Sequence, residues 1–178
     1  MIDIKDIFPE CDADTLLVEL ITKRGKANHN KGVSKVSKAL KNRSDKQGPF
    51  VAVIDSDKFK RLHQDPYLPQ FSEVISNYIN GKEHLKLNKL PNKQHYLVFI
   101  HPEFEPWIWE QAALAEINFE ELGYNNDYKG FETDAKNYGL AQSKKFKKFV
   151  NAVVSANPPG IIMLRRWLVE KNFNMQCI

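Results

Sequence analysis

The chain has 178 residues, of which 42% are hydrophobic and 27% are charged, the balance of a globular domain and not of a disordered segment. No apolar run approaches the length of a membrane span, and the N-terminus lacks the basic start and apolar centre of a signal peptide. Cys11 and Cys177 match no metal-ligand spacing, and we interpret both as thiols of a cytoplasmic protein.

The net charge of +4 is unevenly distributed along the chain. Nine basic residues and a single acid, Asp45, lie between Lys23 and Lys46, and a second basic cluster spans 144–148. Clustered positive charge creates a local field that attracts polyanions. Two interpretations are open for each cluster: a nucleic-acid-binding surface, or the solvated face of a helix.

The N-terminal part of the chain predicts a strand and two helices. Residues 2–8 alternate between polar and apolar, as in a half-buried strand. An amphipathic helix is expected to follow, capped by Asp12 or Asp14 and ended by Gly25. The polar KANHNKG holds at most a very short strand, and GVSKVSKALKN has the apolar spacing of a second helix.

The middle of the chain predicts two buried strands. Phe50–Ile54 is continuously apolar, the pattern of a strand buried on both faces of a parallel sheet. Gln70–Ile79 predicts a helix, and the LKLNKLPNKQ segment after it is expected to be an edge strand or a loop. His95–Ile100 is the second buried strand, and Pro106 suits the first turn of a helix that begins near Glu105.

The C-terminal third is helical, with a break at Pro158–Gly160. The SKKFKKFVNAVVSA helix turns its lysines to water and buries four residues at helical spacing: Phe146, Phe149, Val150 and Val153. The element order predicts an α/β fold with a mostly parallel, Rossmann-like sheet flanked by helices. We expect an α/β core over residues 1–117 and a helical C-terminal extension, packed on it, over residues 118–178.

Carboxylates follow the predicted strands at the points where the strands end: Glu10, then Asp55 and Asp57, then Glu105. Parallel strands bring their carboxyl ends to one edge of the sheet, where α/β proteins bind ligands. Residues two apart on an extended chain point to the same side, so Asp55 and Asp57 can address one ion. Mg²⁺, or Mn²⁺ in its place, suits an all-oxygen site. Read alone, the Asp-Ser-Asp segment is a weak signal for a metal and is simply the polar end of a strand.

These residues resemble a known family. Glu10 followed by a helix, and then FVAVIDSDK with Asp55 and Asp57, resemble the signature of Toprim, the catalytic domain of topoisomerases, DnaG-type primases and overcoming-lysogenization-defect nucleases. The PEFEPWIWEQA segment resembles a Glu-x-Trp element of small Toprim-like proteins in bacterial defence loci. The resemblance covers roughly residues 2–116.

The resemblance implies a nuclease that hydrolyses phosphodiester bonds with Mg²⁺ or Mn²⁺, in defence against phages or plasmids. It implies Glu10 as general acid/base or metal ligand, Asp55 and Asp57 as catalytic metal ligands, and Glu105 as a further ligand. Four lysines are expected to neutralise phosphate charge and bind nucleic acid: Lys31, Lys35, Lys38 and Lys58.

Two other hypotheses stay open. Toprim domains usually have a glycine beside the first glutamate, where this chain has Pro9 and Cys11. A catalytically inactive Toprim-like module that binds nucleic acid or an ATPase partner is therefore the alternative. A receiver or haloacid-dehalogenase domain would also place aspartates at strand ends. It fits less well, because the Asp-Ser-Asp segment follows the second strong strand and no lysine-bearing strand comes after HYLVFI.

Overall fold

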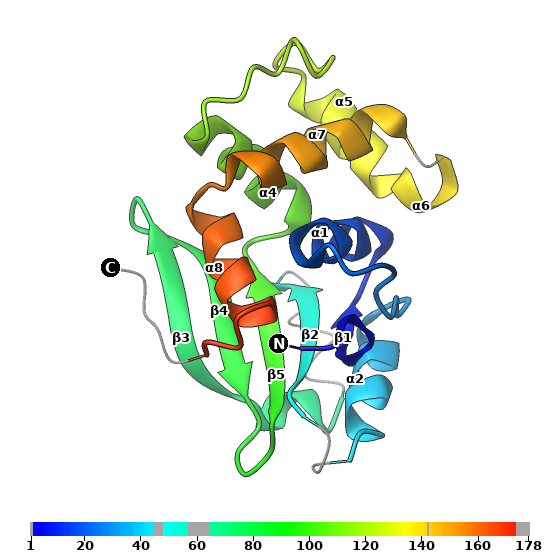
Figure 1. The fold of residues 1–178 in the computed structure, drawn as a ribbon, viewed down its shortest axis with the longest axis vertical. Helices are drawn as coiled ribbons and strands as arrows, with labels where there is room; N and C mark the ends of the chain where they lie inside the picture. The colour runs from blue at the N-terminus through cyan, green and yellow to red at the C-terminus, as the bar shows by residue number, and fades with distance from the viewer. Residues whose placement is uncertain (1, 45–47, 57–64, 142, 174–178) are drawn as a thin grey trace.

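The computed structural model describes residues 2–44, 48–56, 65–141 and 143–173. At its centre lies a five-stranded sheet with the order β1-β2-β5-β4-β3 (Figure 1). The strands are β1 (Ile7–Pro9), β2 (Phe50–Asp55), β3 (Ser72–Ile79), β4 (Lys82–Lys89) and β5 (His95–Ile100). The β1–β2 and β2–β5 pairs are parallel, whereas β4 is antiparallel to both β5 and β3. The expected α/β class is confirmed, but the sheet is mixed and not mostly parallel.

Helices cover both faces of this sheet. They are the 3₁₀ helices η1 (Ile4–Asp6) and η3 (Leu68–Gln70), and α1 (Asp12–Thr22), α2 (Val33–Lys41), α4 (Phe104–Leu114), α5 (Tyr128–Lys136), α6 (Tyr138–Ala141), α7 (Lys144–Ala156) and α8 (Pro159–Leu168). In Figure 1, β2 and β5 run toward the end of the molecule that holds α4, α5, α6 and α7. The carboxyl ends of the parallel strands therefore meet the helical layer.

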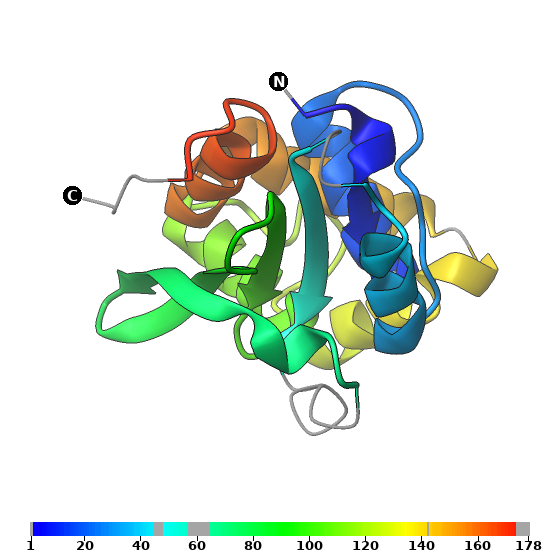
Figure 2. The same ribbon diagram turned by 90° about the horizontal axis from the view of Figure 1, so that it is seen from below.

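Two hydrophobic clusters explain why β2 is apolar throughout. Val51 and Val53 belong to one cluster, with residues of α1, α4, α7 and α8, whereas Ala52 and Ile54 belong to the other, which includes α2. Figure 2 shows α7 and α8 on one side of the sheet and α2 on the other. All six residues of β2 are buried, which confirms the strand predicted over Phe50–Ile54.

The C-terminal helices share the first of these clusters with the sheet. The four residues predicted to be the buried face of α7 are completely buried: Phe146, Phe149, Val150 and Val153. The ring of Trp109 on α4 packs against Phe131 and Phe149, with centroids 5.1 and 5.7 Å apart. Aromatic packing therefore fixes α5 and α7 against α4. Within the described residues, no helix is both long and apolar enough to cross a membrane.

The helix predicted over Gln70–Ile79 is wrong, because this segment forms β3 and pairs with β4 in a hairpin. The connection is Asn80–Gly81, with φ angles of 51° and 75°. Tight hairpin turns need positive φ at both central residues, and Asn-Gly supplies them. The first half of the LKLNKLPNKQ segment belongs to β4, which lies between β5 and β3 and is not an edge strand, whereas residues 90–94 form the expected loop.

The N-terminal prediction needs two further corrections. The strand expected over residues 2–8 is shorter, because Ile4–Asp6 forms η1 and only Ile7–Pro9 pairs with β2. Helix α1 is capped by Cys11 and not by either aspartate. The Asp14 backbone N–H donates to Cys11 Sγ at 3.4 Å, and the Cys11 N–H donates to Asp14 Oδ2 at 3.3 Å. This reciprocal pair is a capping box built on a thiol.

Gly160, in the first turn of α8, provides a test of this packing. A Cβ here would lie 2.7 Å from Gln111 Oε1 and 2.9 Å from Trp107 Cζ2. We expect Gly160→Ala to lower the free energy of unfolding by about 1–3 kcal/mol, because overpacking displaces its neighbours. Urea denaturation measures the change. The neighbouring exposed Pro159→Ala is the control, with a loss of about 0.4–1 kcal/mol, and an equal loss in both variants would contradict the close approach of α8 to α4.

Candidate functional site

Two carboxylates are buried where neighbouring parallel strands end. Glu10 directly follows β1, and Asp55 is the last residue of β2. The Glu10 N–H donates to the carbonyl of Val53 at 3.1 Å, which holds Glu10 beside β2. Only 5% of Glu10 and 6% of Asp55 are exposed. The sheet thus brings together two of the predicted site residues through backbone pairing alone.

Asp14 adds a third buried carboxylate, in the first turn of α1. It is 0% exposed, and its Oδ1 has no hydrogen-bond partner among the described residues. Burial raises the pKa of Asp14 well above its usual value, and the charges of Asp55 and Glu10 raise it further. The three carboxylates therefore share one electrostatic environment and repel one another there.

Asp55 also determines where α4 begins. Its Oδ1 accepts a hydrogen bond from the Phe104 N–H at 3.0 Å. Phe104 is the first residue of α4, where the backbone N–H groups have no partner within the helix. The positive end of the α4 dipole thus lies against the Asp55 carboxylate and favours its negative charge.

An open cleft of about 420 Å³ lies at this edge of the sheet. The start of α1, the end of β2, the start of α4, the end of α5 and α6 all contribute to its wall. Its charged lining residues are Asp12, Asp55, Glu103, Glu105 and Lys136. With four acids and one base, the cleft attracts cations, and an anion would enter it together with a cation.

Cys11 also lines the cleft, but its sulfur is unsuited to nucleophilic attack. Burial, above all, raises the pKa of the Cys11 thiol well above its ordinary value, and the negative charges of Asp14 and Asp55 add to the effect. The reactive form of cysteine is the thiolate. Cys11 therefore remains a protonated thiol at neutral pH and serves to cap α1.

The structure places the other predicted site residues as follows. Glu105 lines the cleft together with Asp55. Asp57 and Lys58 lie outside the described residues. Lys31, Lys35 and Lys38 are exposed, the last two on α2, and they do not line the cleft. They therefore form a separate basic surface, since α2 covers the face of the sheet opposite α1.

A complete metal shell is not present in the described part of the chain. Among residues 2–44, 48–56, 65–141 and 143–173, no three acidic, histidine or cysteine side chains lie close enough to enclose one ion. Asp57, the second carboxylate of the Asp-Ser-Asp segment, is not among these residues. The described residues therefore line the cleft with acidic side chains but do not form a complete set of ligands for a metal ion.

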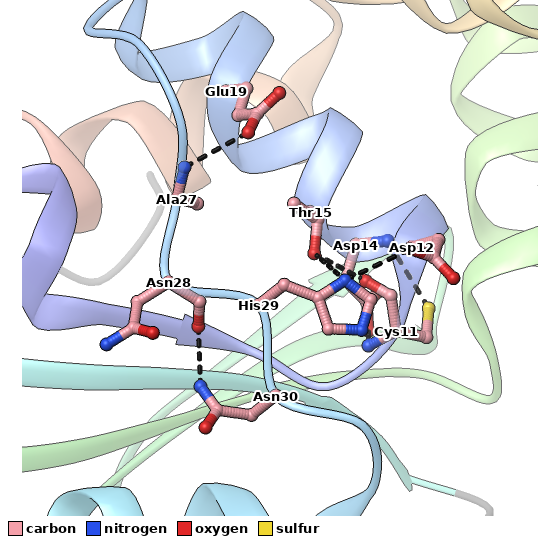
Figure 3. A network of polar contacts seen from close by, with 9 residues as sticks. All are labelled: Cys11, Asp12, Asp14, Thr15, Glu19, Ala27, Asn28, His29 and Asn30. Atoms are coloured by element: carbon pink, nitrogen blue, oxygen red, sulfur yellow. Dashed lines mark hydrogen bonds and ion pairs between the residues drawn. The ribbon is translucent and has the colours of Figure 1, made fainter. Parts of the chain in front are cut away.

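Sequence analysis missed the roles of Asp14 and Lys136. The sequence predicts Asp14 only as a possible helix cap. The Cys11–Asp14 spacing is that of a capping box (Figure 3), but spacing alone does not indicate that the Asp14 side chain is completely buried. Lys136 comes from the C-terminal extension, and its Nζ lies 2.6 Å from Glu132 Oε1. The hydrogen bond that Lys136 donates to Glu132 raises the pKa of Lys136, and the negative charges of Glu132, Glu105 and Glu103 raise it further. No local sequence pattern marks Lys136 as a site residue, because α5 lies near the strand ends only in the folded chain.

Comparisons of the chain with protein-family models, with curated proteins and with solved structures found no match. The evidence for a site is therefore the geometry of the cleft and of the carboxylates beside it.

The raised pKa of Asp14 predicts a pH-dependent effect of Asp14→Asn. A carboxyl whose folded-state pKa is raised stabilises the fold below its unfolded-state pKa, and this stability is lost as pH rises. Asparagine keeps the acceptor for the Cys11 N–H but carries no charge. We therefore expect Asp14→Asn to raise the thermal midpoint in EDTA, by more at pH 8 than at pH 5.

Differential scanning calorimetry across this pH range measures the effect. The exposed Glu120→Gln removes one negative charge without relieving burial, and we expect it to leave the midpoint unchanged within about 0.5 kcal/mol of stability. A lower midpoint for Asp14→Asn at every pH would contradict the repulsion between the three carboxylates.

Proposed function

We propose that the protein is a Toprim-like nuclease that uses Mg²⁺ or Mn²⁺ to hydrolyse phosphodiester bonds at the carboxyl edge of its sheet. The observation that carries the proposal is the burial of Glu10, Asp14 and Asp55 beside one another. Buried like charges need protons or a cation. The Oδ1 of Asp14 lacks a hydrogen-bond partner among the described residues, and a cation held by Glu10 and Asp55 would offset the negative charge of this neighbouring carboxylate by its own charge.

The residues of the site divide into ligands and charge-neutralising groups. Glu10, Asp55 and Asp57 would hold the metal, with Glu105 as a further ligand from the start of α4. Carboxylate oxygens are the ligands that Mg²⁺ prefers. When bound there, the ion would supply Lewis-acid chemistry, polarisation of the phosphoryl oxygen and stabilisation of the leaving oxygen. The ammonium of Lys136, which also lines the cleft, would neutralise charge on the bound phosphate.

Nucleic acid extends beyond one phosphate, and basic surfaces outside the cleft suit its backbone. Lys31, Lys35 and Lys38 are exposed on and before α2, and the α7 lysines at 144–148 are exposed on the helical layer. Lys58, which follows the Asp-Ser-Asp segment in the sequence, would neutralise a phosphate closer to the metal ligands. We propose cytoplasmic nucleic acid of phages or plasmids as the substrate, with binding that weakens steeply as salt increases.

The second candidate is a catalytically inactive Toprim-like module that binds nucleic acid or an ATPase partner. Pro9 and Cys11 favour it, because they flank Glu10 where Toprim domains usually have a glycine. The incomplete metal shell within the described residues favours it as well. Metal binding and cleavage, measured separately, distinguish the two candidates.

Asp55→Asn tests the nuclease directly, because asparagine retains the acceptor for the Phe104 N–H while removing the charge. We expect Mn²⁺ affinity to fall about tenfold or more and cleavage of DNA and RNA to fall about 100-fold or more. Calorimetry measures the first change and a gel assay the second, with Glu120→Gln as control. Wild-type protein that binds no Mn²⁺ would contradict the nuclease, and wild-type binding without cleavage would favour the inactive module.

Lys136→Met tests whether α5 contributes to the site. Without this ammonium we expect Mn²⁺ affinity to rise about twofold to fivefold and substrate KM to rise by a similar factor, because one cation no longer repels the metal or attracts the phosphate. Lys129→Met, exposed on the same helix but not lining the cleft, is the matched control. Equal changes in both variants would exclude a local role for Lys136.

A further inference from the structure

Strand β3 forms one edge of the sheet (Figure 1). It is the last strand in the order β1-β2-β5-β4-β3, and no described strand pairs with its outer side. Edge strands pair with further strands unless lysine, proline or a short length prevents it. The eight residues of β3 contain neither lysine nor proline, and their single charged side chain, Glu73, is neutralised by Lys86 at 3.3 Å. This edge can therefore accept another strand.

Exposed apolar side chains are concentrated on the same strand. Tyr78 is 61% exposed and Val74 is 41% exposed. The only other large apolar side chain that is exposed in the described part of the chain is Leu114, on α4. Apolar residues that gather on one exposed element indicate an interaction surface, whereas scattered ones do not. Strand β3 thus combines an edge position with exposed apolar area.

The buried amide of Asn77 indicates which strand would pair there. Asn77 lies on β3 and is 2% exposed, and neither Oδ1 nor Nδ2 of its side chain has a hydrogen-bond partner among the described residues. Buried polar groups in folded proteins are nearly always hydrogen-bonded. An asparagine amide carries both donors and an acceptor, so a second asparagine amide satisfies it in both directions. A second copy of β3 brings such an amide with it.

The sequence around Asn77 is self-complementary for antiparallel pairing. Between Ile75 and Ile79 the strand is regular, since the extra residue of the nearby register shift, His84, belongs to β4. Ile75, Asn77 and Ile79 therefore point to one face of the sheet. A two-fold axis through Asn77 places the two amides opposite each other, with Cβ atoms about 4.5–5.5 Å apart. It also places Ile75 opposite Ile79 of the second copy.

We propose that β3 is a dimerisation edge, at which two copies of the chain pair antiparallel about Asn77 and join their sheets into one. Such an interface is isologous, as in most symmetric dimers. Each Asn77 amide donates a hydrogen bond to the other and accepts one from it. On the opposite face of the strand, the exposed ring of Tyr78 lies over Ser76 of the second copy. Another protein would need an amide at the matching position, which a second copy always provides.

The dimer does not depend on the proposed nuclease. Strand β3 runs in the same direction as β2, because the pairs β3–β4 and β4–β5 are antiparallel and the pair β2–β5 is parallel. Antiparallel pairing of two β3 strands thus places the clefts of the two copies at opposite ends of the joined sheet. No residue of β3 is among the described residues that line the cleft, so each copy keeps a separate site.

Disulfide trapping tests the register of the proposed pair. In a background that carries Cys11→Ser and Cys177→Ser, we expect oxidation to convert most of the Asn77→Cys protein into a covalent dimer, because the axis brings the two sulfurs within bonding reach. Glu73→Cys, exposed on the same strand, is the matched control. Its two copies lie about 25 Å apart along the paired strands, so we expect it to remain monomeric. Equal cross-linking in both variants would overturn the pairing about Asn77.

Sedimentation equilibrium tests the edge without altering the buried amide. Pairing along one edge is smaller than a standard interface, so the wild-type protein is measured at up to about 0.5 mM, and we expect a monomer–dimer equilibrium. Tyr78→Lys places a lysine on the edge, and we expect it to raise the dissociation constant of the dimer about tenfold or more. Leu114→Lys, the matching replacement of an exposed apolar residue on α4, should leave this constant unchanged. A monomeric wild-type protein, or equal effects of the two variants, would overturn the proposal.

Discussion

The mutual repulsion of three buried carboxylates is the constraint on which the site depends. Glu10 directly follows β1, Asp55 ends β2 and Asp14 lies in the first turn of α1, and all three are buried. Burial and the charges of Asp55 and Glu10 raise the pKa of Asp14, and like charges in a poorly solvated place cost stability. The fold offsets part of this cost, because α4 places its N-terminal N–H groups against Asp55. A divalent cation would remove much of the remainder, which links the stability of this edge to its chemistry.

The helical C-terminal region contributes to the site as well as to the core. Phe131 and Phe149 pack on Trp109 of α4, and this packing positions the end of α5 beside the strand ends. Gly139 completes the wall, because any Cβ there would collide with the carboxylate of Asp12. The hydrophobic cluster that stabilises the domain is therefore also what brings Lys136 into the lining of the same cleft as the acids.

The sequence correctly predicted those helices and strands that have a strong local pattern of apolar residues. The apolar run of β2 and the spacing of Phe146, Phe149, Val150 and Val153 in α7 are of this kind. The β3 strand was missed because its edge position leaves few apolar residues, although Asn80–Gly81 signals a hairpin. The Cys11 cap was missed because thiols are not among the preferred capping groups. The strand-end positions of Glu10 and Asp55 follow from sequence, whereas the presence of Lys136 in the cleft lining depends on how α5 packs in the folded chain, which no local pattern reveals.

The central claim is that the crowded carboxylates hold a divalent cation. Its most direct test is a crystal grown with Mn²⁺, with diffraction data collected at the manganese absorption edge. The account predicts an anomalous peak at the carboxyl ends of β1 and β2, within about 2.0–2.3 Å of oxygens of Glu10 and Asp55. The same crystal should place Asp57 and show whether it completes the shell. A cleft without an anomalous peak at millimolar Mn²⁺, with the carboxylates still buried, would contradict the account.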